Sequence, residues 1–501
     1  MTRMDRLSVP IALGGAAVVI STFSLSRSGV LYDDAYIYFR YVDNLRGACP
    51  LAYNCADGPL EGFTSALYLA VLWLGSFGLA NLPALSQMLG SGFLWLTLLG
   101  LAVSESRLKH WHGVDPKLVT LFAVAVLGLD PFFLINGVTG LETSLAALLV
   151  TLLYRAAQSE SLAGLRRLVV LAVLARPECV LFALFIPVLP RARSPRYWVP
   201  LIVAGVCIAL LRWLIFADVL PNTFWAKAGG TARHFELGVR YLGECVLDFP
   251  LVLAAPLALL HARPIAPVVY LLSVTVTWML FFLRSGGDFF DFSRLFFPLV
   301  PVLTWLGVAA LSASARDLLG HRRIAGWPSH VALLAALLVL IVVFNSQLHA
   351  LRPMDHHPKH ERWAQVGEFI ATHHPGWSVA TTPVGLIGHR SGAHIIDLVG
   401  LVSREVAHHG DVAPNFPNVG HEKYATDWVL EQRPDLIVTM DWSQAPIRPG
   451  SFPTRMTLGE ADLARRIHAG RAPYLLYHPE VAPGLYWYMF IRKDRADQKV
   501  H

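Results

Sequence analysis

The sequence has few charged residues for its length. Of its 501 residues, 15% are charged and 54% are hydrophobic, and the mean hydropathy is +0.49. Soluble globular proteins carry about 25% charged residues, so this composition excludes an ordinary cytosolic enzyme. Apolar residues dominate and glycine shows no period, which excludes disordered and collagen-like chains. Five cysteines are too few for a disulfide scaffold.

The charge balance is mildly basic. Lysine and arginine exceed aspartate and glutamate by six. In a hydrophobic chain this surplus indicates anchoring of cytoplasmic loops rather than nucleic-acid binding. The composition therefore predicts an integral membrane protein whose partner is the lipid bilayer, with no nucleic-acid partner.

Long apolar runs recur through the first 350 residues. A helix that crosses about 30 Å of hydrocarbon needs about 20 such residues. The first run follows two arginines but lacks a convincing small-residue cleavage site, so we expect an uncleaved first helix. About eleven spans are predicted, at residues 9–29, 64–81, 84–104, 118–136, 142–157, 167–189, 197–217, 247–263, 265–283, 295–313 and 329–348.

The last 150 residues differ from the rest. Residues 350–501 hold 13 of the 20 histidines and no stretch able to cross a membrane. Short apolar runs, typical of strands, alternate there with helix-like segments, which predicts a small α/β domain. The strands are expected at 378–382, 394–399, 435–440, 473–477 and 486–491, and the helices at 359–372, 422–433 and 458–469. The predicted domains are a transmembrane catalytic domain (1–349, first external loop 30–63) and this extracytoplasmic domain (350–501).

Basic residues set the expected orientation. With the N-terminus inside and eleven spans, the arginines near positions 3, 193 and 320 lie in the cytoplasm, and the tail lies outside. The basic loops 105–117 and 155–167 then fall on the wrong side. Either a segment is miscounted or those charges serve another purpose.

Two adjacent acids, Asp33 and Asp34, follow the first span. Acids at the start of a helix are often simple caps. Carboxylates at a membrane edge are nevertheless costly and are candidates for function. A carboxylate there can accept a proton from a sugar hydroxyl or hold a divalent metal. In the same loop, Cys49 and Cys55 are either a small disulfide in an oxidising compartment or two free thiols.

Other polar residues interrupt the apolar segments. The Arg176–Glu178 pair is more readily explained as a self-satisfied structural pair than as a site. Lys227, after the seventh span, is either an interfacial anchor or a phosphate ligand. Gly286 and Gly287 permit close backbone approach, and nearby Arg294 could grip a phosphodiester.

These motifs together resemble those of bacterial GT-C glycosyltransferases, specifically the group with the terminal β-arabinofuranosyltransferases of cell-wall arabinan synthesis. Their order and spacing carry the resemblance, which covers nearly the whole chain. The motifs are Asp-Asp-Ala-Tyr-Ile-x-Phe-Arg-Tyr (33–41), Glu-Gly-Phe-Thr (61–64), Gly-Leu-Glu-Thr (140–143), Ala-Arg-Pro-Glu (175–178), Pro-Asn-Thr-x-x-Ala-Lys (221–227), Gly-Gly-Asp…Arg-Leu-Phe-x-Pro (286–298), Gly-Leu-Ile-Gly (385–388), Ile-Asp-Leu-Val-Gly-Leu (396–401) and Gly-His-Glu-Lys (420–423).

The resemblance implies an inverting enzyme of the cell membrane that uses a polyprenyl-phosphate-linked sugar, best guessed as arabinofuranose. Its acceptor is a cell-envelope glycan or glycolipid on the outer face. Asp33 maps onto the general base, and Asp34 supports it or binds a divalent cation such as Mg²⁺ or Mn²⁺; no cofactor is certain. Stabilising the phosphate leaving group is assigned to Lys227 and Arg294. Sugar or acceptor recognition is assigned to Glu61, Glu142 and Asp288.

Other functions fit less well. A transporter or flippase would place charges near the midplane and often shows two similar halves, but only Arg176 and Glu178 favour that function. A non-catalytic glycan sensor would not need both acids of the 33–34 pair. The tail histidines show no zinc-ligand spacing. The glycines at 385–388 lack the dinucleotide fingerprint, so a turn is expected there.

Overall fold

The computed structural model describes residues 3–27, 30–109, 111, 114–159, 162–227, 232–320, 323–324, 327–351, 356–413, 419–448, 451 and 453–496. The chain forms two compact units, and neither is one continuous segment. Unit 1 comprises Met1–Val30, Ser65–Ile208 and Phe235–Met354. Unit 2 comprises Leu31–Thr64, Ala209–His234 and Asp355–His501. The first loop therefore belongs with the tail, across almost 300 residues of sequence.

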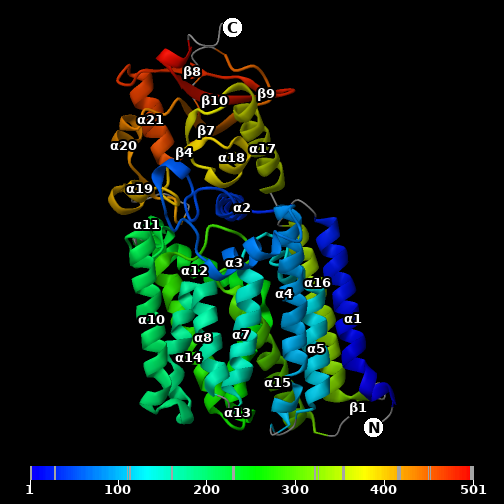
Figure 1. Cartoon of the computed structure of the whole chain (residues 1–501). Coiled ribbons are helices and arrows are strands. Elements are labelled where there is room, and N and C mark those ends of the chain that lie inside the picture. The colour runs from blue at the N-terminus through cyan, green and yellow to red at the C-terminus, as the bar shows by residue number, and fades with distance from the viewer. Residues whose placement is uncertain are drawn as a thin grey trace. The chain divides into compact units, whose positions relative to one another are not determined.

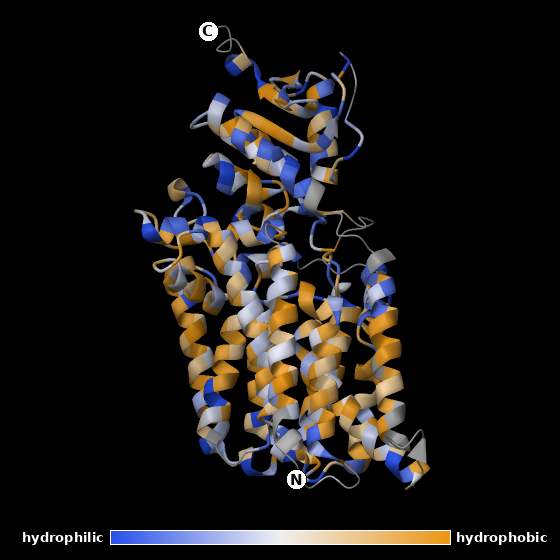
Figure 2. Cartoon of the chain, turned by 90° about the vertical axis from the view of Figure 1, so that its right-hand side faces the viewer, coloured by the Kyte–Doolittle hydropathy of each residue, from blue (hydrophilic) through white to orange (hydrophobic). Residues whose placement is uncertain are grey.

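Unit 1 is helical, and its long helices lie side by side (Figure 1). They are apolar along most of their length (Figure 2). Its α-helices are α1 (Arg3–Ser26), α3 (Ala66–Gly75), α4 (Leu82–Ala102), α5 (Pro116–Leu129), α6 (Pro131–Ile135), α7 (Thr143–Ala157), α8 (Leu162–Ala175), α9 (Val180–Leu184), most of α10 (Pro195–Phe216) and of α12 (Ala232–Asp248), α13 (Ala258–His261), α14 (Ala266–Ser285), α15 (Val300–Leu319) and α16 (Ser329–Leu351). Short 3₁₀ segments and the pair β1 (Arg323–Ile324) and β2 (Trp327–Pro328) connect them.

Several helices are long and apolar enough to cross a bilayer. Among the described residues there are five, or six if the pair Arg233–Asp248 and Pro250–His261, bent by 89°, is one span. Shorter apolar helices of 10–17 residues accompany them. The chain is therefore membrane-embedded, as its composition predicts.

Four predicted spans are not single helices over their predicted length: 64–81, 118–136, 167–189 and 247–263. The run at 118–136 breaks between α5 and α6 at the Asp130–Pro131 step, and the run at 247–263 contains the bend of 89° after Asp248. The run at 64–81 contains only α3, whose ten residues extend about 15 Å, half the hydrocarbon thickness. The run at 167–189 is not one helix, because α8 ends at Ala175 and a broken helical segment, Pro177–Val188, follows the Arg176–Pro177 step. Proline removes a backbone donor and disfavours helical geometry in the residue before it, which accounts for the break.

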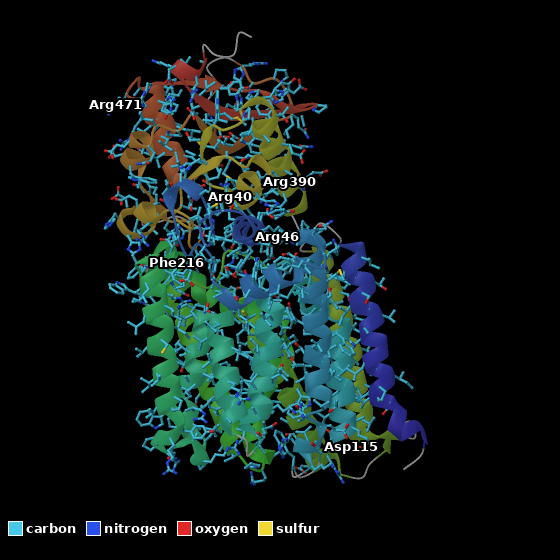
Figure 3. The ribbon with its side chains drawn as sticks, in the orientation of Figure 1. Arg40, Arg46, Asp115, Phe216, Arg390 and Arg471 are labelled. Atoms are coloured by element: carbon cyan, nitrogen blue, oxygen red, sulfur yellow. A yellow bond between two sulfur atoms is a disulfide. The ribbon has the colours of Figure 1, made fainter. Side chains whose placement is uncertain are left out.

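These corrections bring the basic loops of unit 1 together. The Arg107 guanidinium donates to the Gln158 carbonyl at 3.3 Å, Arg191 donates to Ala157, and Arg166 donates to Arg196 at 3.0 Å. The segments after α4 and α7 and before α8 and α10 therefore lie at one end of the unit. Asp115 lies at this end too (Figure 3). The basic stretches 105–117 and 155–167 thus share one end of unit 1 with the segment before α10, and the orientation of that end in the membrane stays a prediction.

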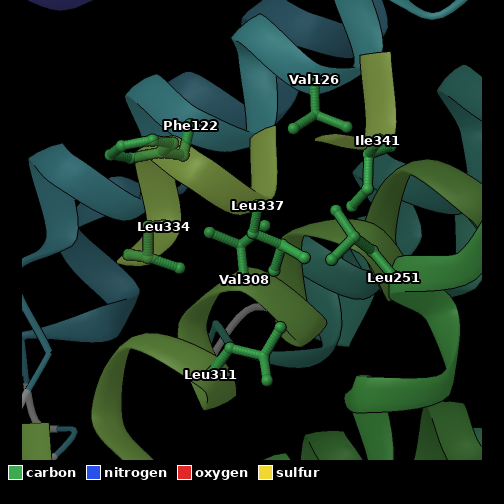
Figure 4. Close-up of a pocket in the computed structure, with 8 residues that line it drawn as sticks. All are labelled: Phe122, Val126, Leu251, Val308, Leu311, Leu334, Leu337 and Ile341. Atoms are coloured by element: carbon green, nitrogen blue, oxygen red, sulfur yellow. The ribbon is translucent and has the colours of Figure 1, made fainter. Parts of the chain in front are cut away.

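One part of the interior of unit 1 is wholly apolar. A small cavity lies between α5, α15, α16 and the 3₁₀ segment Pro250–Leu257 (Figure 4). Its lining has no polar side chain: Phe122, Val126, Leu251, Val308, Leu311, Leu334, Leu337 and Ile341. Such a cavity offers a polar substrate no hydrogen bond.

Unit 2 contains a mixed sheet. In the order β4, β3, β7, β10 and β8, the first three strands are parallel neighbours and the last two pairings are antiparallel; β9 pairs with β10. The strands are β3 (Ser378–Thr381), β4 (His394–Asp397), β7 (Leu436–Ser443), β8 (Tyr474–Tyr477), β9 (Glu480–Ala482) and β10 (Leu485–Arg492), with β5 (Asp411–Val412) and β6 (Lys423–Tyr424) as a separate pair. The helices are α2 (Asp33–Arg46), α11 (Asn222–Lys227), α17 (His356–His373), α18 (Val384–Ser391), α19 (Arg404–His409), α20 (Thr426–Glu431), α21 (Leu458–His468) and α22 (Lys493–Ala496).

The predicted α/β character of the tail is confirmed. Each of the five expected strands overlaps an observed one, and α17 and α21 lie where helices were expected. The predicted helix at 422–433 is shorter, because β6 occupies its start and α20 begins at Thr426. Inward-facing residues of the strands and of α21 form an apolar core that includes Ile396, Ile437 and Phe490.

Candidate functional site

The start of α2 is held by the tail. One carboxylate oxygen of Asp33 accepts a hydrogen bond from the Leu386 N–H at 2.7 Å, and the other accepts from the Gly385 N–H at 2.9 Å. Burial raises the pKa of Asp33 to about 7; the two N–H groups oppose this rise and the charge of Asp34 adds to it. Asp33 therefore joins the first loop to the beginning of α18.

Close packing explains the glycines of the 385–388 motif. A Cβ on Gly385 would lie 1.9 Å from the backbone oxygen of Asp33, and one on Gly388 would lie 2.1 Å from the Tyr53 hydroxyl. Both distances are far below van der Waals contact. The motif forms about one turn, near the start of the short helix α18, and packs with its backbone against α2; it is not the isolated turn expected from the sequence.

Arg40 makes the densest polar contact between the first loop and the tail (Figure 3). Its guanidinium donates to the carbonyls of Tyr53, Gly388 and Ala393, each at 2.8 Å, and to the Asn54 side chain at 3.0 Å. It also lies 4.4 Å from the centroid of the Tyr53 ring. Arg40 thus organises backbone from three segments and has little capacity left for a ligand.

Asn222 fixes the position of the 221–227 motif through its hydrogen bonds. Its side-chain amide donates to the carbonyls of Gly400 and Leu401 at 2.7 and 3.0 Å, and its backbone N–H donates to Glu61 at 3.0 Å. Asp397 shapes the turn that presents these carbonyls, because its carboxylate accepts the N–H groups of Val399 and Val402. Three motifs that are far apart in the sequence therefore meet here.

Lys227 ends α11 beside the 420–423 motif. Its side chain lies along Gly420, where a Cβ would come within 3.1 Å of the Lys227 Cγ. Burial lowers the pKa of the neighbouring His421; the charge of Asp34 opposes that shift and the charge of Lys227 adds to it. Both charges must lie near the imidazole to act on it. Asp34, Lys227 and His421 therefore form one cluster in unit 2.

A second pair supports the same loop. The Glu422 carboxylate interacts with His234 Nε2 at 3.0 Å and accepts the Gly420 N–H at 2.7 Å. These contacts fix the backbone on both sides of His421. Lys227 itself is exposed, and among the described residues it has no ion-pair partner. Its ammonium group is thus available to an anion.

Three other predicted site residues, Glu142, Asp288 and Arg294, lie in unit 1 and are already paired. Glu142 and Glu178 contact the Arg176 guanidinium at 3.0 and 3.3 Å. Asp288 accepts two hydrogen bonds from Arg294, at 2.7 and 3.1 Å. Arg176 and Arg294 are close enough for their charges to interact, so the two groups form one buried charged cluster.

The predicted site is therefore divided between the units. Unit 2 holds Asp33, Asp34 and Lys227, together with Glu61, which forms an ion pair with Arg212 at 3.0 Å. Unit 1 holds Glu142, Asp288 and Arg294. The roles assigned to these residues stay predictions.

Two smaller predictions concern the first loop. Cys49 and Cys55 are joined by a disulfide in the structure. In the part of the chain that the structure describes, no three His, Cys, Asp or Glu side chains are grouped to hold a metal ion. A cation at Asp34 stays a prediction, and no step below depends on it.

Sequence reasoning missed several residues of this region. Arg40, Asn222 and His421 stand inside the recognised motifs, but their residue types gave no sign of their partners. Asn54 lies outside every motif; its side chain accepts the Ile395 N–H at 3.0 Å and donates to the Ile395 carbonyl at 2.8 Å. The signal available was only the presence of polar residues within otherwise apolar motifs.

Comparison with known proteins supports the fold. Residues 350–481 match a family described as a domain of unknown function, DUF8728. No curated protein matches the chain. The apo oligosaccharyltransferase of Archaeoglobus fulgidus is similar, with a TM-score of 0.57 and 12% identity over 88% of this chain and 70% of that one.

Two more solved structures share the arrangement. AglB from Archaeoglobus fulgidus, an archaeal oligosaccharyltransferase in complex with an inhibitory peptide and a dolichol-phosphate, gives a TM-score of 0.54 and 13% identity over 97% of this chain and 74% of its own. Apo ArnT from Cupriavidus metallidurans gives 0.52 and 11% identity over 96% and 97%. This chain therefore has the fold of GT-C membrane enzymes, as predicted; identities this low speak for the fold alone.

Proposed function

We propose that this protein is a membrane glycosyltransferase that moves a sugar from a polyprenyl-phosphate donor to a glycan or glycolipid acceptor on the outer face of the cell membrane. The observation that carries the proposal is the cluster of Asp34, Lys227 and His421 in unit 2. It combines a carboxylate, an exposed cation and a partly buried imidazole, drawn from three distant segments. The GT-C fold supports the same reaction class, and the best candidate for the transferred sugar remains arabinofuranose.

The proposed reaction is a single displacement with inversion. Asp34 accepts the proton of the acceptor hydroxyl while that oxygen attacks the anomeric carbon. The bond from that carbon to the phosphate oxygen breaks, and its electron pair stays on the polyprenyl phosphate. Lys227 stabilises the negative charge that grows there. His421, neutral near pH 7 because burial lowers its pKa, can hydrogen-bond to the sugar without adding a charge.

Asp33 is proposed as a positioning residue, which exchanges the roles expected for the two acids. Both of its oxygens already accept backbone N–H groups of α18, at 2.7 and 2.9 Å. A base must reach a substrate proton within about 3 Å, and occupied oxygens are poorly placed for that. Asp33 and Asp34 are both partly exposed, so the hydrogen bonds of Asp33 to α18 are what distinguishes the two acids here.

The reaction is tested with membranes that contain the protein and are supplied with radiolabelled polyprenyl-phosphate arabinose, mannose or glucose. Transfer from one donor to a glycan acceptor, absent from membranes without the protein, supports the proposal and names the sugar. Absence of transfer from all three, with correctly folded protein and several acceptors, contradicts it.

Matched variants distinguish the roles proposed for Asp33 and Asp34. Asp34→Asn removes the base at nearly constant shape, so we expect transfer to fall at least about 100-fold with unchanged melting temperature. Asp33→Asn turns one acceptor oxygen into a donor facing an N–H, so we expect a lower melting temperature and a smaller loss of activity. The opposite pattern would return the base role to Asp33.

A further inference from the structure

A groove in unit 1 lies far in the sequence from the proposed site. It runs between α8 and α10 and has a volume of about 500 Å³. Its walls are mainly apolar and two arginines stand in it; the lining residues are Ala163, Arg166, Arg167, Val170, Leu171, Pro200 and Leu201. The arginines lie near the start of α8, in the basic stretch 155–167 that was expected to be a loop, and the proposed function leaves them unused.

The two arginines differ in their contacts. Arg166 is fixed: its guanidinium donates to the Arg196 carbonyl at 3.0 Å and lies 5.3 Å from the centroid of the Tyr197 ring. Arg167 is exposed, and no carboxylate pairs with it among the described residues. Arg166 is thus held in place by its neighbours, and the exposed charge of Arg167 can interact with a ligand in the groove.

The groove opens on exposed faces of α8 and α10. Ala163, Arg167 and Leu171 recur every four residues and form one exposed face of α8. The facing helix α10 is strongly apolar and almost entirely exposed along its length. An apolar channel that carries positive charge near one helix end matches a lipid with acyl chains and a negative headgroup.

We propose that this groove binds an anionic phospholipid of the bilayer leaflet at the α8 N-terminal end. The headgroup phosphate pairs with Arg167, Arg166 shapes the site, and the acyl chains lie against Val170, Leu171 and Leu201. The basic residues gathered at this end favour the same leaflet, because anionic lipid attracts lysine and arginine there. The inference does not depend on the proposed sugar transfer.

The test is native mass spectrometry of the purified full-length protein in detergent. It receives phosphatidylglycerol, phosphatidylcholine or glycerol 3-phosphate. We expect retained phosphatidylglycerol, little phosphatidylcholine and no glycerol 3-phosphate. Arg167→Gln should weaken phosphatidylglycerol binding about fivefold, the effect of one arginine near anionic lipid. Arg316→Gln is the matched control, because Arg316 is exposed near the end of α15 and outside the groove.

A second variant tests the apolar part of the groove, which is proposed to hold the acyl chains. Ala163→Trp fills the groove on an exposed helix face, so the protein should fold and lose bound phosphatidylglycerol. Equal binding of the two phospholipids, equal effects of Arg167→Gln and Arg316→Gln, or binding of glycerol 3-phosphate in place of the lipid would each overturn the proposal.

Discussion

Removal of the Arg40 side chain should release the first loop from the tail within unit 2. The guanidinium makes four hydrogen bonds of 2.8–3.0 Å, three of them to backbone carbonyls. At about 1 kcal/mol net for each bond, Arg40→Ala should cost about 4 kcal/mol. For a unit of about 200 residues, that corresponds to a drop in melting temperature of about 10 °C.

The assay is thermal unfolding of the purified protein followed by tryptophan fluorescence, with limited proteolysis of the tail as a second readout. Arg46→Ala is the matched control, since Arg46 lies on the same helix with an exposed side chain (Figure 3). It should change stability by less than about 0.5 kcal/mol. Arg40→Lys keeps the charge but cannot reproduce the planar fork, so it should fall between the two. Equal melting temperatures for Arg40→Ala and Arg46→Ala would refute the reasoning.

Three further predictions concern unit 2. Gly385→Ala places a Cβ 1.9 Å from the Asp33 backbone oxygen, so it should lower the melting temperature by more than a surface substitution does; wild-type stability would contradict this packing. Replacing Cys49 and Cys55 by serine should cost about 2 kcal/mol for so short a loop, and a reducing agent should then have no further effect on the variant's melting curve. Burial raises the pKa of Glu460 from 4.5 to about 7, so the folded unit binds this proton more tightly than the unfolded chain does. The resulting stabilisation is complete below about pH 4.5 and is lost as the pH rises through 7. Glu460→Gln should therefore reduce the dependence of the melting temperature on pH between pH 4.5 and 8.

The sequence was sufficient for the features that depend on local pattern. Alternating apolar runs located the strands of the tail, and the low charge indicated the membrane. The prediction of membrane spans from hydropathy was wrong where the chain turns within an apolar run. Residues 64–81 and 167–189 are mostly apolar, yet Gly75 ends α3 early and the Arg176–Pro177 step breaks the second run. Composition carries no information on where a backbone turns.

The site was predictable only in part. The acids and Lys227 were found because motifs marked them, but the partners of these residues could not be. Asp33 contacts backbone more than 350 residues away, and Asn222 contacts backbone almost 180 residues away. The partners in such pairs are backbone N–H and C=O groups. Every residue except proline has both, so the residue type at the far position does not reveal the contact. The glycines at 385 and 388 carried the only hint, since small residues permit such contact.

The discontinuous make-up of unit 2 has a consequence for biosynthesis. Thr64 closes its first segment and Asp355 opens its last, so about 290 residues are made in between. At about 5–20 residues per second, the ribosome needs about 15–60 s for that stretch. Asp33 and Arg40 of the first loop therefore cannot form their hydrogen bonds to the tail until the whole helical unit has been synthesised. Assembly of the acid pair with the tail is then one of the last events in the maturation of the protein.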